Sequence, residues 1–483
     1  MPCTYAKLTR DWSLRGWEDV EWACVNRRDG EHVPLTRKAL YVAEACDGST
    51  DFTSMAFLPE HRAILAAFID VGMAARCRRG EVIQPRQRYR RAENPLLITV
   101  HWCVTGRCNL NCRHCYMDSP TGRYGALPRQ DMLRLVEEFE RANVVQVSLT
   151  GGEPFLREDL VEIIGALLGR GIWVSQIYTN ATLVTARALA ELRALGADPG
   201  FQVSFDGCGG HDYLRGTAGA EEATLEGIRR LRAAGFPVVV ASSIDRVNAS
   251  SLLSTYDLLR TLEVEAWRIG TPLPIGRWRQ ATTALSFDEQ AEVLEPLLER
   301  WIEDERPFEM SFGQFTRAPE QGGHVAEILH SSAAYDCGSC REKPNLLPDG
   351  TLVPCPGYVD SDLQPLMPNV LRDGLPEAWT AAILRSLRDM KKSDVLAENP
   401  ECAECGQFGN CGAGCRASAL RETGRLMSKD PVSCELWRCG YKQRFHELVE
   451  SSNPSGRRTR LPRAHGGSAA LQVQGRSVNT LPR

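Results

Sequence analysis

The chain has 483 residues and a formal net charge of −4 at pH 7. This length allows two to four domains, and the balanced charge gives no overall argument for a nucleic-acid or membrane partner. No run of 18 apolar residues predicts a membrane span, and residues 1–22 lack the apolar centre of an export signal. We therefore expect a cytoplasmic protein with no membrane partner and no nucleic-acid partner.

Cysteine is the unusual component, because the chain contains 18 of them. The cytosol keeps thiols reduced, so dense sets of cysteines predict metal or cluster ligation rather than disulfides. Three fall within residues 108–115, and nine lie from Cys337 to Cys439. The others are scattered, as is typical of small apolar core residues: Cys3, Cys24, Cys46, Cys77, Cys103 and Cys208.

Residues 1–92 predict a small leading α+β domain. Its apolar pattern indicates a short strand at 20–26 and helices near 35–45 and 60–71. The basic stretch at 86–91 (RQRYRR) is interpreted as a linker to the next domain.

From residue 95 on, apolar runs alternate with amphipathic stretches, which predicts βαβ units and a parallel sheet. Six strands are too few for a closed eight-stranded barrel. We therefore expect an α/β fold, an open partial (β/α)6 TIM-like barrel over residues 93–320, with functional side chains at the carboxyl ends of its strands. The expected strands are 96–104, 144–149, 172–179, 201–205, 237–244 and 265–270.

The remainder of the chain divides into two further segments. Residues 330–440 are rich in Gly, Pro and Cys, so bound clusters rather than an apolar core are expected to hold this loop-rich domain together. Residues 451–483 contain no acidic residue and few large apolar ones, which predicts a disordered basic tail. A solvated tail is favoured over a peptide-binding or nucleic-acid-binding one.

The spacing Cys108-x3-Cys112-x2-Cys115 follows the first expected strand of the barrel. Cysteine thiolates are the usual ligands of iron–sulfur clusters, and three ligands on one loop leave one iron of a four-iron cube open. A zinc site would need a fourth ligand from protein or water. His114, between two of the cysteines, is not expected to be a ligand.

This motif, followed by the aromatic Tyr116, resembles the signature of the radical S-adenosylmethionine (SAM) superfamily. The resemblance implies a [4Fe–4S] cluster on the three cysteines, SAM on the open iron, and a 5′-deoxyadenosyl radical that abstracts hydrogen from a substrate. It also implies an external reductant such as flavodoxin or ferredoxin.

Further residues fit the same family. Residues 151–154 (GGEP) resemble its GGEP motif, where glycines permit close backbone approach and Glu153 accepts hydrogen bonds from the methionine ammonium. Residues 204–207 resemble its S-x-D-G motif, in which Asp206 is either part of the site or a turn cap. Ser242 is a candidate for either a SAM contact or a structural role. The residues expected to contact SAM are Tyr116, Gly151, Gly152, Glu153, Asn180, Ser204 and Arg215.

The C-terminal cysteines resemble the SPASM extension, which binds two auxiliary [4Fe–4S] clusters in peptide-modifying enzymes. The ligands implied for the first auxiliary cluster are Cys337, Cys340, Cys355 and Cys415. Those implied for the second are Cys402, Cys405, Cys411 and Cys434. Cys439 is left as an alternative to Cys434 or as a hydrogen-atom donor. The competing interpretation, one zinc site on the two CxxC pairs, leaves four cysteines unexplained.

Residues 35–55 resemble the small winged-helix domains that bind leader peptides in peptide-modifying systems. A leader would then add as a strand to a sheet edge, whereas the alternative is a domain without a partner. DNA binding is disfavoured because residues 35–71 contain no basic recognition helix.

These resemblances imply a radical SAM enzyme that acts on a ribosomally made precursor peptide. The product would be a crosslink, a thioether, an epimerised residue or a decarboxylated terminus. One rival is a SPASM enzyme that acts on a sulfatase or on a tetrapyrrole or quinone cofactor precursor. Another rival is a non-catalytic iron–sulfur protein of electron transfer or regulation.

Overall fold

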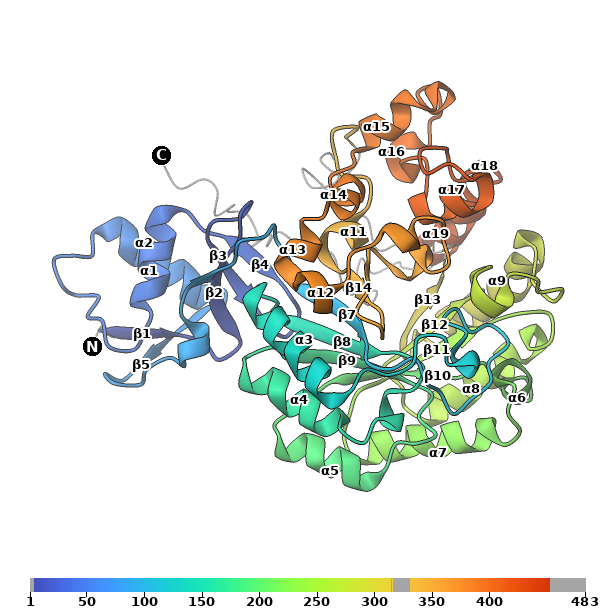
Figure 1. The fold of residues 1–483 in the computed structure, drawn as a ribbon, viewed down its shortest axis with the longest axis horizontal. Helices are drawn as coiled ribbons and strands as arrows, with labels where there is room; N and C mark the ends of the chain where they lie inside the picture. The colour runs from blue at the N-terminus through green and yellow to red at the C-terminus, as the bar shows by residue number, and fades with distance from the viewer. Residues whose placement is uncertain (1–3, 314, 316–330, 452–483) are drawn as a thin grey trace.

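The computed structural model describes residues 4–313, 315 and 331–451. The predicted tail lies outside the described residues, apart from residue 451. Along the chain come a leading domain, a large α/β domain and a C-terminal domain that lies against the α/β domain (Figure 1). No helix within these ranges is long and apolar enough to cross a membrane.

The leading domain has two small sheets and two helices. One sheet pairs β1 with β5, and the other has the order β4-β3-β2-β6. Helices α1 and α2 bury Val42 and Phe68 against these sheets. The elements are β1 (Tyr5–Leu8), β2 (Trp12–Gly16), β3 (Ala23–Asn26), β4 (His32–Pro34), α1 (Arg37–Ala45), α2 (Pro59–Asp70), β5 (Ala74–Cys77) and β6 (Arg90–Arg91).

The interpretation of residues 86–91 as a linker is wrong. The last two residues of this segment form β6, which pairs in parallel with β2. The reason is Arg15, whose buried guanidinium donates to the carbonyl oxygens of Arg86 (2.8 Å) and Arg88 (3.2 Å). The basic segment therefore belongs to the leading domain.

The α/β domain is built on one large sheet with the order β13-β12-β11-β10-β9-β8-β7-β14-β15. Strands β7 to β13 pair in parallel with their neighbours. The six expected strands are present as β7 (Thr99–Cys103), β8 (Gln146–Thr150), β9 (Trp173–Thr179), β10 (Gly200–Ser204), β11 (Val238–Ser243) and β12 (Ala266–Gly270).

The sequence predicted six parallel strands for this domain, and the structure has a seventh. After α9 (Phe287–Glu303), the strand β13 (Glu309–Phe312) pairs in parallel with β12. Its four residues are too short a run to give a strand signal in the sequence. The helices that connect the strands are α3 (Arg129–Arg141), α4 (Leu160–Gly169), α5 (Ala186–Ala194), α6 (His211–Arg215), α7 (Ala220–Ala233) and α8 (Leu252–Thr261).

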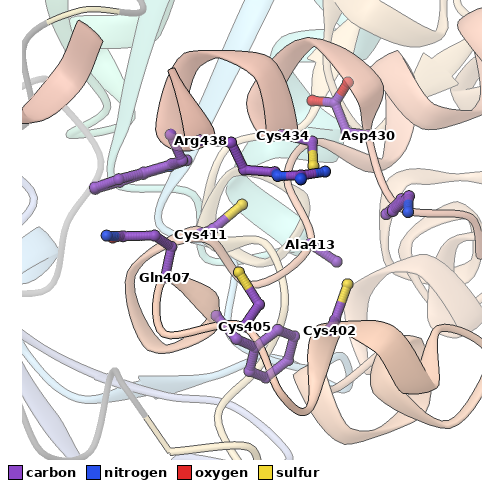
Figure 2. Close-up of a pocket in the computed structure, with 11 residues that line it drawn as sticks. Cys402, Cys405, Gln407, Cys411, Ala413, Asp430, Cys434 and Arg438 are labelled. Atoms are coloured by element: carbon purple, nitrogen blue, oxygen red, sulfur yellow. The ribbon is translucent and has the colours of Figure 1, made fainter. Parts of the chain in front are cut away.

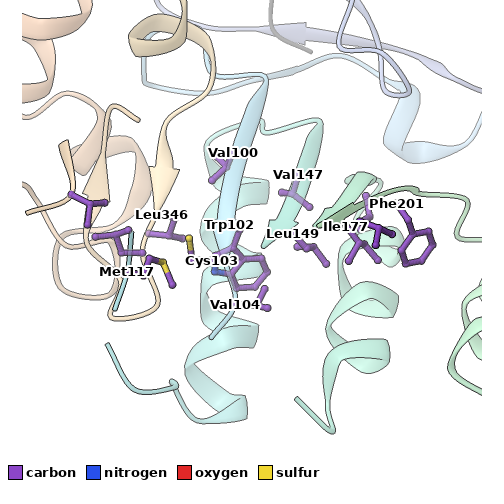
Figure 3. Packing of buried hydrophobic residues seen from close by; sticks show 14 of the residues in the cluster. Val100, Trp102, Cys103, Val104, Met117, Val147, Leu149, Ile177, Phe201 and Leu346 are labelled. Carbon is purple, nitrogen blue, oxygen red and sulfur yellow. The ribbon is translucent and has the colours of Figure 1, made fainter. Parts of the chain in front are cut away.

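The outer face of the sheet carries the apolar core. Helix α3 buries Leu135 and Phe139 on its inward stripe. The Phe139 ring meets the Trp102 ring of β7 edge-on at 4.9 Å, a contact worth about 0.5–1.5 kcal/mol beyond area burial. Figure 3 shows this layer of apolar side chains along β7 to β10. Since side chains alternate along strands, the intervening residues face the barrel interior.

The C-terminal domain continues the same sheet. Its strand β14 (Asn345–Leu346) pairs in parallel with β7 and antiparallel with β15 (Leu352–Val353). The domain also has an apolar core with Trp379 fully buried, so bound clusters are not its only source of cohesion. Its helices are α11 (Gly338–Glu342), α12 (Val370–Asp373), α13 (Leu375–Trp379), α14 (Ala382–Arg388), α15 (Lys392–Ala397), α16 (Phe408–Cys411), α17 (Arg416–Thr423), α18 (Pro431–Arg438) and α19 (Tyr441–Ser451).

The leading domain packs on the amino ends of the barrel strands. The Trp17 indole donates to the Ala142 carbonyl (3.2 Å), and the Asn143 side chain donates to the Gly16 carbonyl (3.1 Å). Trp17 shares an apolar cluster with Val145, which directly precedes β8. The cysteine motif follows the carboxyl end of β7, so the leading domain lies at the opposite end of the barrel.

Candidate functional site

The cysteine loop and the GGEP turn pack backbone against backbone. The amide of Gly152 donates to the Thr105 carbonyl (2.8 Å), and that of Glu153 donates to the Arg107 carbonyl (2.9 Å). Gly151 has φ +145°, and a Cβ on Gly152 would lie 2.1 Å from the Arg107 oxygen. Both positions therefore require glycine for the turn to lie against the cysteine loop.

Glu153 joins the carboxyl ends of two strands and is fully buried. Its Oε1 accepts hydrogen bonds from the Thr179 hydroxyl (2.8 Å) and the Phe155 amide (3.0 Å), and its Oε2 accepts one from the Asn180 amide (2.8 Å). Burial raises the pKa of this carboxyl to about 7, against these hydrogen bonds, which lower it. Glu153 thus has a structural role besides the predicted contact with SAM.

Asn180 ties β9 to the start of the cysteine loop. Its Nδ2 donates to Asn109 Oδ1 (2.9 Å) and lies 3.9 Å from Cys108 Sγ. The Asn109 side chain in turn donates to the Thr182 hydroxyl (2.8 Å). The structure therefore places Asn180 at the cysteine loop, and its expected contact with SAM stays a prediction.

Asp206 and Arg215 form a buried ion pair beneath the cysteine loop. Arg215 Nη2 donates to Asp206 Oδ1 (2.9 Å), while its Nη1 lies 3.8 Å from Cys112 Sγ. Burial raises the pKa of Asp206, but the charge of Arg215 and the hydrogen bond from the Ser243 amide (2.9 Å) hold that pKa below its usual value. Asp206 is therefore the counter-ion of Arg215 and more than a turn cap.

Two residues after β12 clamp the cysteine loop, and the sequence interpretation missed both. Gly276 has φ +55°, and a Cβ there would lie 2.4 Å from the Cys115 carbonyl oxygen. The amide of Arg277 donates to that same oxygen (3.2 Å), and its guanidinium donates to the carbonyls of Asn111 and Cys112 (both 3.2 Å). Their position after the sixth expected strand is the only signal that would have identified them.

Each cysteine of the loop has a hydrogen-bond donor at its sulfur. The Leu110 amide donates to Cys108 Sγ (3.4 Å), and the Ser119 amide donates to Cys115 Sγ (3.3 Å). The Arg215 guanidinium is the donor at Cys112 Sγ. Burial nevertheless raises the pKa of Cys108 to about 12. Thiolates at this site therefore need a strong positive partner such as cluster iron, which the three sulfurs of one loop fit.

Two other sequence candidates, Tyr116 and Ser242, have contacts that fix their surroundings. The Tyr116 hydroxyl lies 3.7 Å from the sulfur of Cys103 on β7. The Ser242 hydroxyl donates to a backbone carbonyl and accepts from the Trp267 indole (2.7 Å), which is a structural role. Burial lowers the pKa of His114 to about 4, so its ring is neutral. Ser204 ends β10 and is half-buried.

The first C-terminal set of cysteines is brought together as predicted. The thiols of Cys337, Cys355 and Cys415 are near enough to Cys340 to raise its pKa, with Cys337 hydrogen-bonded to it. Tyr358 adjoins all four sulfurs, and its pKa is raised by burial and by their charges. Cys337 directly precedes α11 and Cys340 lies in it, Cys355 follows β15, and Cys415 is the N-cap of α17.

The second set lines one pocket, shown in Figure 2. Its sulfurs point toward a common space between α16 and α18. The pocket-lining cysteines are Cys402, Cys405, Cys411 and Cys434. Cys439 is exposed at the end of α18 and does not line this pocket.

The geometry differs from that of a single-ion site. Among the described residues, no three His, Cys, Asp or Glu side chains are placed to hold one metal ion. All described cysteines are free thiols. A pocket lined by four cysteines that are too widely spaced for one ion fits a larger group such as a four-iron cube.

Comparison with known proteins places these motifs in context. The sequence profile of the Radical SAM superfamily matches residues 102–259. The AdoMet-dependent heme synthase of Oleidesulfovibrio alaskensis is 28% identical over 73% of this chain and 89% of its own. The mycofactocin maturase MftC of Mycobacterium tuberculosis is 26% identical over 70% of this chain and 82% of its own.

The fold likeness extends over more of the chain. Streptococcus suis SuiB bound to S-adenosylmethionine has a TM-score of 0.64 and 14% identity, and the match covers 89% of this chain and 99% of SuiB. SuiB bound to its precursor peptide SuiA gives a TM-score of 0.62 at 13% identity. A match over 89% of 483 residues extends into residues 1–92, because the residues after 92 make up a smaller share.

Proposed function

This chain is a radical SAM enzyme, and we propose that it modifies a ribosomally made precursor peptide. The observation that carries the proposal is the three-cysteine loop, held on the rim of a partial barrel by residues that follow four different strands. The mycofactocin maturase MftC is similar to this chain in sequence. SuiB, which was solved with a precursor peptide, is similar to it in fold. The leading domain has a counterpart in SuiB, at least in part.

The residues of the rim have distinct tasks in this proposal. Cys108, Cys112 and Cys115 hold a [4Fe–4S] cluster, which together with SAM supplies a 5′-deoxyadenosyl radical when both are bound. Glu153 Oε2 accepts one hydrogen bond from protein and keeps a lone pair for the ammonium of SAM. Ser204 has no side-chain hydrogen bond within the described ranges and is assigned to a ribose contact.

Arg215 is assigned one role beyond the SAM contact that the sequence predicts. Its guanidinium is engaged by Asp206 and faces Cys112, so it places a fixed positive charge beside the cluster ligands. Such a charge stabilises thiolates and the anionic cluster they hold. A contact from Arg215 to the carboxylate of SAM remains part of the proposal, through the guanidinium edge that Asp206 does not occupy.

The two C-terminal sets are proposed to hold auxiliary [4Fe–4S] clusters. The grouping of their eight sulfurs matches the two ligand sets that the SPASM resemblance implies. These clusters serve electron transfer or structural support, since each has four protein ligands. A flavodoxin or ferredoxin supplies the electrons, as the family implies.

The leading domain is proposed to bind the leader of the peptide. Strand β4 is an edge of the four-stranded sheet, so its outer side is available to an added strand. On α1, Tyr41 is 44% exposed and stacks with Phe57 at 5.4 Å, and Leu58 beside it is also exposed. A domain that offers both an edge strand and exposed apolar side chains suits an extended peptide.

A second candidate is the modification of a tetrapyrrole. It is favoured by the heme synthases, which are 28% identical to this chain. The leading domain and its likeness in SuiB favour the peptide. Anaerobic incubation of the reconstituted, reduced enzyme with SAM and candidate precursor peptides from short reading frames near its gene, followed by mass spectrometry, separates the two. We expect a changed peptide mass; an unchanged peptide together with turnover of a porphyrin would contradict the proposal.

A further inference from the structure

The barrel interior contains a layer of polar side chains at mid-strand height. His101 Nδ1 lies 2.7 Å from the Ser148 hydroxyl, and the His101 ring meets the Tyr178 ring edge-on at 4.9 Å. Across the interior, Arg268 Nη1 donates to Gln202 Oε1 (2.8 Å). These residues come from β7, β8, β9, β12 and β10, on the sheet face away from α3. None of these residues has a role in the proposed binding of SAM or of the clusters.

A second cation lies at the same layer. Lys343 lies two residues before the start of β14 and is half-buried, and within the described ranges it makes no hydrogen bond and no ion pair. Burial and then the charge of Arg268 lower its pKa to about 8, and Lys343 in turn lowers the pKa of His101. The acid near Arg268 is Glu309 on β13. Two cations and one acid leave one positive charge in the layer.

Two buried amides in this region have atoms without a partner. Asn345 is fully buried, and its Oδ1 faces the Cys103 sulfur (3.5 Å), whereas its Nδ2 has no hydrogen bond. Gln176 is 2% exposed, and its Oε1 has no partner. It lies opposite Ser148 in the sheet register, on the same face. A buried polar atom without a hydrogen-bond partner destabilises the folded protein, so both sites call for a polar ligand.

The layer lies directly below the cysteine loop. Asn345 stands opposite His101 in the register of β14 and β7. Cys103, which contacts both Asn345 and the Tyr116 hydroxyl, is two residues further along β7. Two residues of a strand span about 6.6 Å. A group held at the layer therefore presents its neighbouring atoms to the space under the radical-generating loop.

We propose that Lys343, Arg268 and Asn345 bind a carboxylate of the substrate inside the barrel. A guanidinium and an amide N–H form planar, directional contacts with carboxylate oxygens. One net positive charge suits a monoanionic carboxylate better than a dianionic phosphate. The identity of the substrate as a peptide rests on the proposed function, but the carboxylate site does not. In a peptide, this group is either an acidic side chain or the C-terminus.

The test measures acetylation of Lys343 in the reconstituted, SAM-loaded enzyme by a succinimidyl acetate, read by peptide mass spectrometry. The probes are N-acetylvaline, N-acetylglutamic acid α-amide and the neutral N-acetylvalinamide. At ten times its dissociation constant, a bound carboxylate slows labelling about tenfold. The exposed Lys391 in the same digest is the internal control and keeps its rate. Which of the two acids protects better identifies the source of the carboxylate.

Protection by a carboxylate probe and not by the amide supports the proposal. Equal protection by N-acetylvalinamide, or no protection by either acid, overturns it. Arg268→Gln is expected to abolish the protection, whereas Arg187→Gln, 87% exposed on α5, keeps it; iron content shows that both variants are loaded. If carboxylates protect Lys343 but no candidate precursor peptide is modified, the proposed function fails and the carboxylate site stands. If such a peptide is modified without this protection, only the site fails.

Discussion

The two cysteine regions of this molecule are built in different ways. The loop at 108–115 is clamped by groups that follow β8, β9, β10 and β12, so its backbone and its sulfur atoms are positioned by protein contacts. The C-terminal cysteines lie on short helices and on the loops that flank them, and their eight sulfurs gather in two groups. The first region is preorganised for chemistry, whereas the second, if it holds the proposed auxiliary clusters, gains part of its rigidity from them.

One residue connects the two C-terminal groups. Asp430 Oδ2 accepts hydrogen bonds from the Cys415 amide (3.1 Å) and the Ser433 hydroxyl (2.7 Å). Cys415 belongs to the first set, and Asp430 caps α18, which carries Cys434 of the second set. The two groups are therefore mechanically coupled, and this region responds to loss of either one as a unit.

The largest effect is expected from the loop cysteines. The triple variant Cys108→Ala, Cys112→Ala and Cys115→Ala loses the cofactor that carries the chemistry, so formation of 5′-deoxyadenosine falls at least about 10³-fold. Iron falls from about twelve to about eight per chain. Chromatography and iron analysis check both values. Full activity in this variant would contradict the assignment of the loop.

The C-terminal region is tested by Cys434→Ala against Cys439→Ala. Loss of a ligand removes about four irons and lowers the thermal midpoint, because cluster binding contributes folding free energy here. Cys439 lies outside the pocket, so its variant keeps its iron and its midpoint. If Cys439→Ala instead loses the iron, the ligand assignment of the second set is wrong.

Asp206→Asn tests the preorganised region by leaving the Arg215 charge buried without its partner. We expect a loss of about 3–5 kcal/mol in the free energy of unfolding, measured by anaerobic denaturant titration. The matched control is Asp257→Asn, since Asp257 is 62% exposed and lies 4.0 Å from Arg300; its loss stays below about 1 kcal/mol. Equal losses would show that the buried pair does not hold the loop.

Glu153 predicts a pH dependence confined to the same region. Its folded pKa of about 7 lies above the ordinary value of 4.5, so the folded state binds more protons between these values. Stability is therefore highest below pH 4.5 for this group and falls as pH rises toward 7, by roughly 2–3 kcal/mol. Glu153→Gln removes this slope. Parallel curves for both proteins would contradict the buried, raised carboxyl.

The smallest effect is expected from Arg277→Gln at the half-exposed clamp. Loss of its hydrogen bonds to the loop carbonyls costs about 1 kcal/mol, which corresponds to roughly fivefold faster iron loss to a chelator. Arg279→Gln is the control, because that side chain donates only to the Asp360 carbonyl at 3.4 Å. If both variants release iron at the wild-type rate, the clamp does not hold the loop.

The sequence predicted those features that depend on local pattern. Strand and helix alternation located β7 to β12, and the SPASM resemblance implied the two C-terminal cysteine sets whose members the structure places near one another. Features that depend on contacts between distant segments could not be predicted from the sequence. The segment 86–91 joins a sheet because Arg15 binds its carbonyls, and Arg277 reaches the loop only once β12 stands beside it. The ion pair of Asp206 with Arg215 likewise needs the fold, because each residue alone resembles an ordinary turn residue.

The most direct test of the central claim follows the abstracted hydrogen atom. A candidate precursor peptide that the enzyme modifies is made with deuterium in its modifiable residues and incubated anaerobically with the reduced enzyme and SAM. Mass spectrometry then measures deuterium in 5′-deoxyadenosine. The account predicts one deuterium transferred from the peptide to 5′-deoxyadenosine, together with a changed peptide mass. Formation of unlabelled 5′-deoxyadenosine with an unchanged, fully deuterated peptide would contradict it.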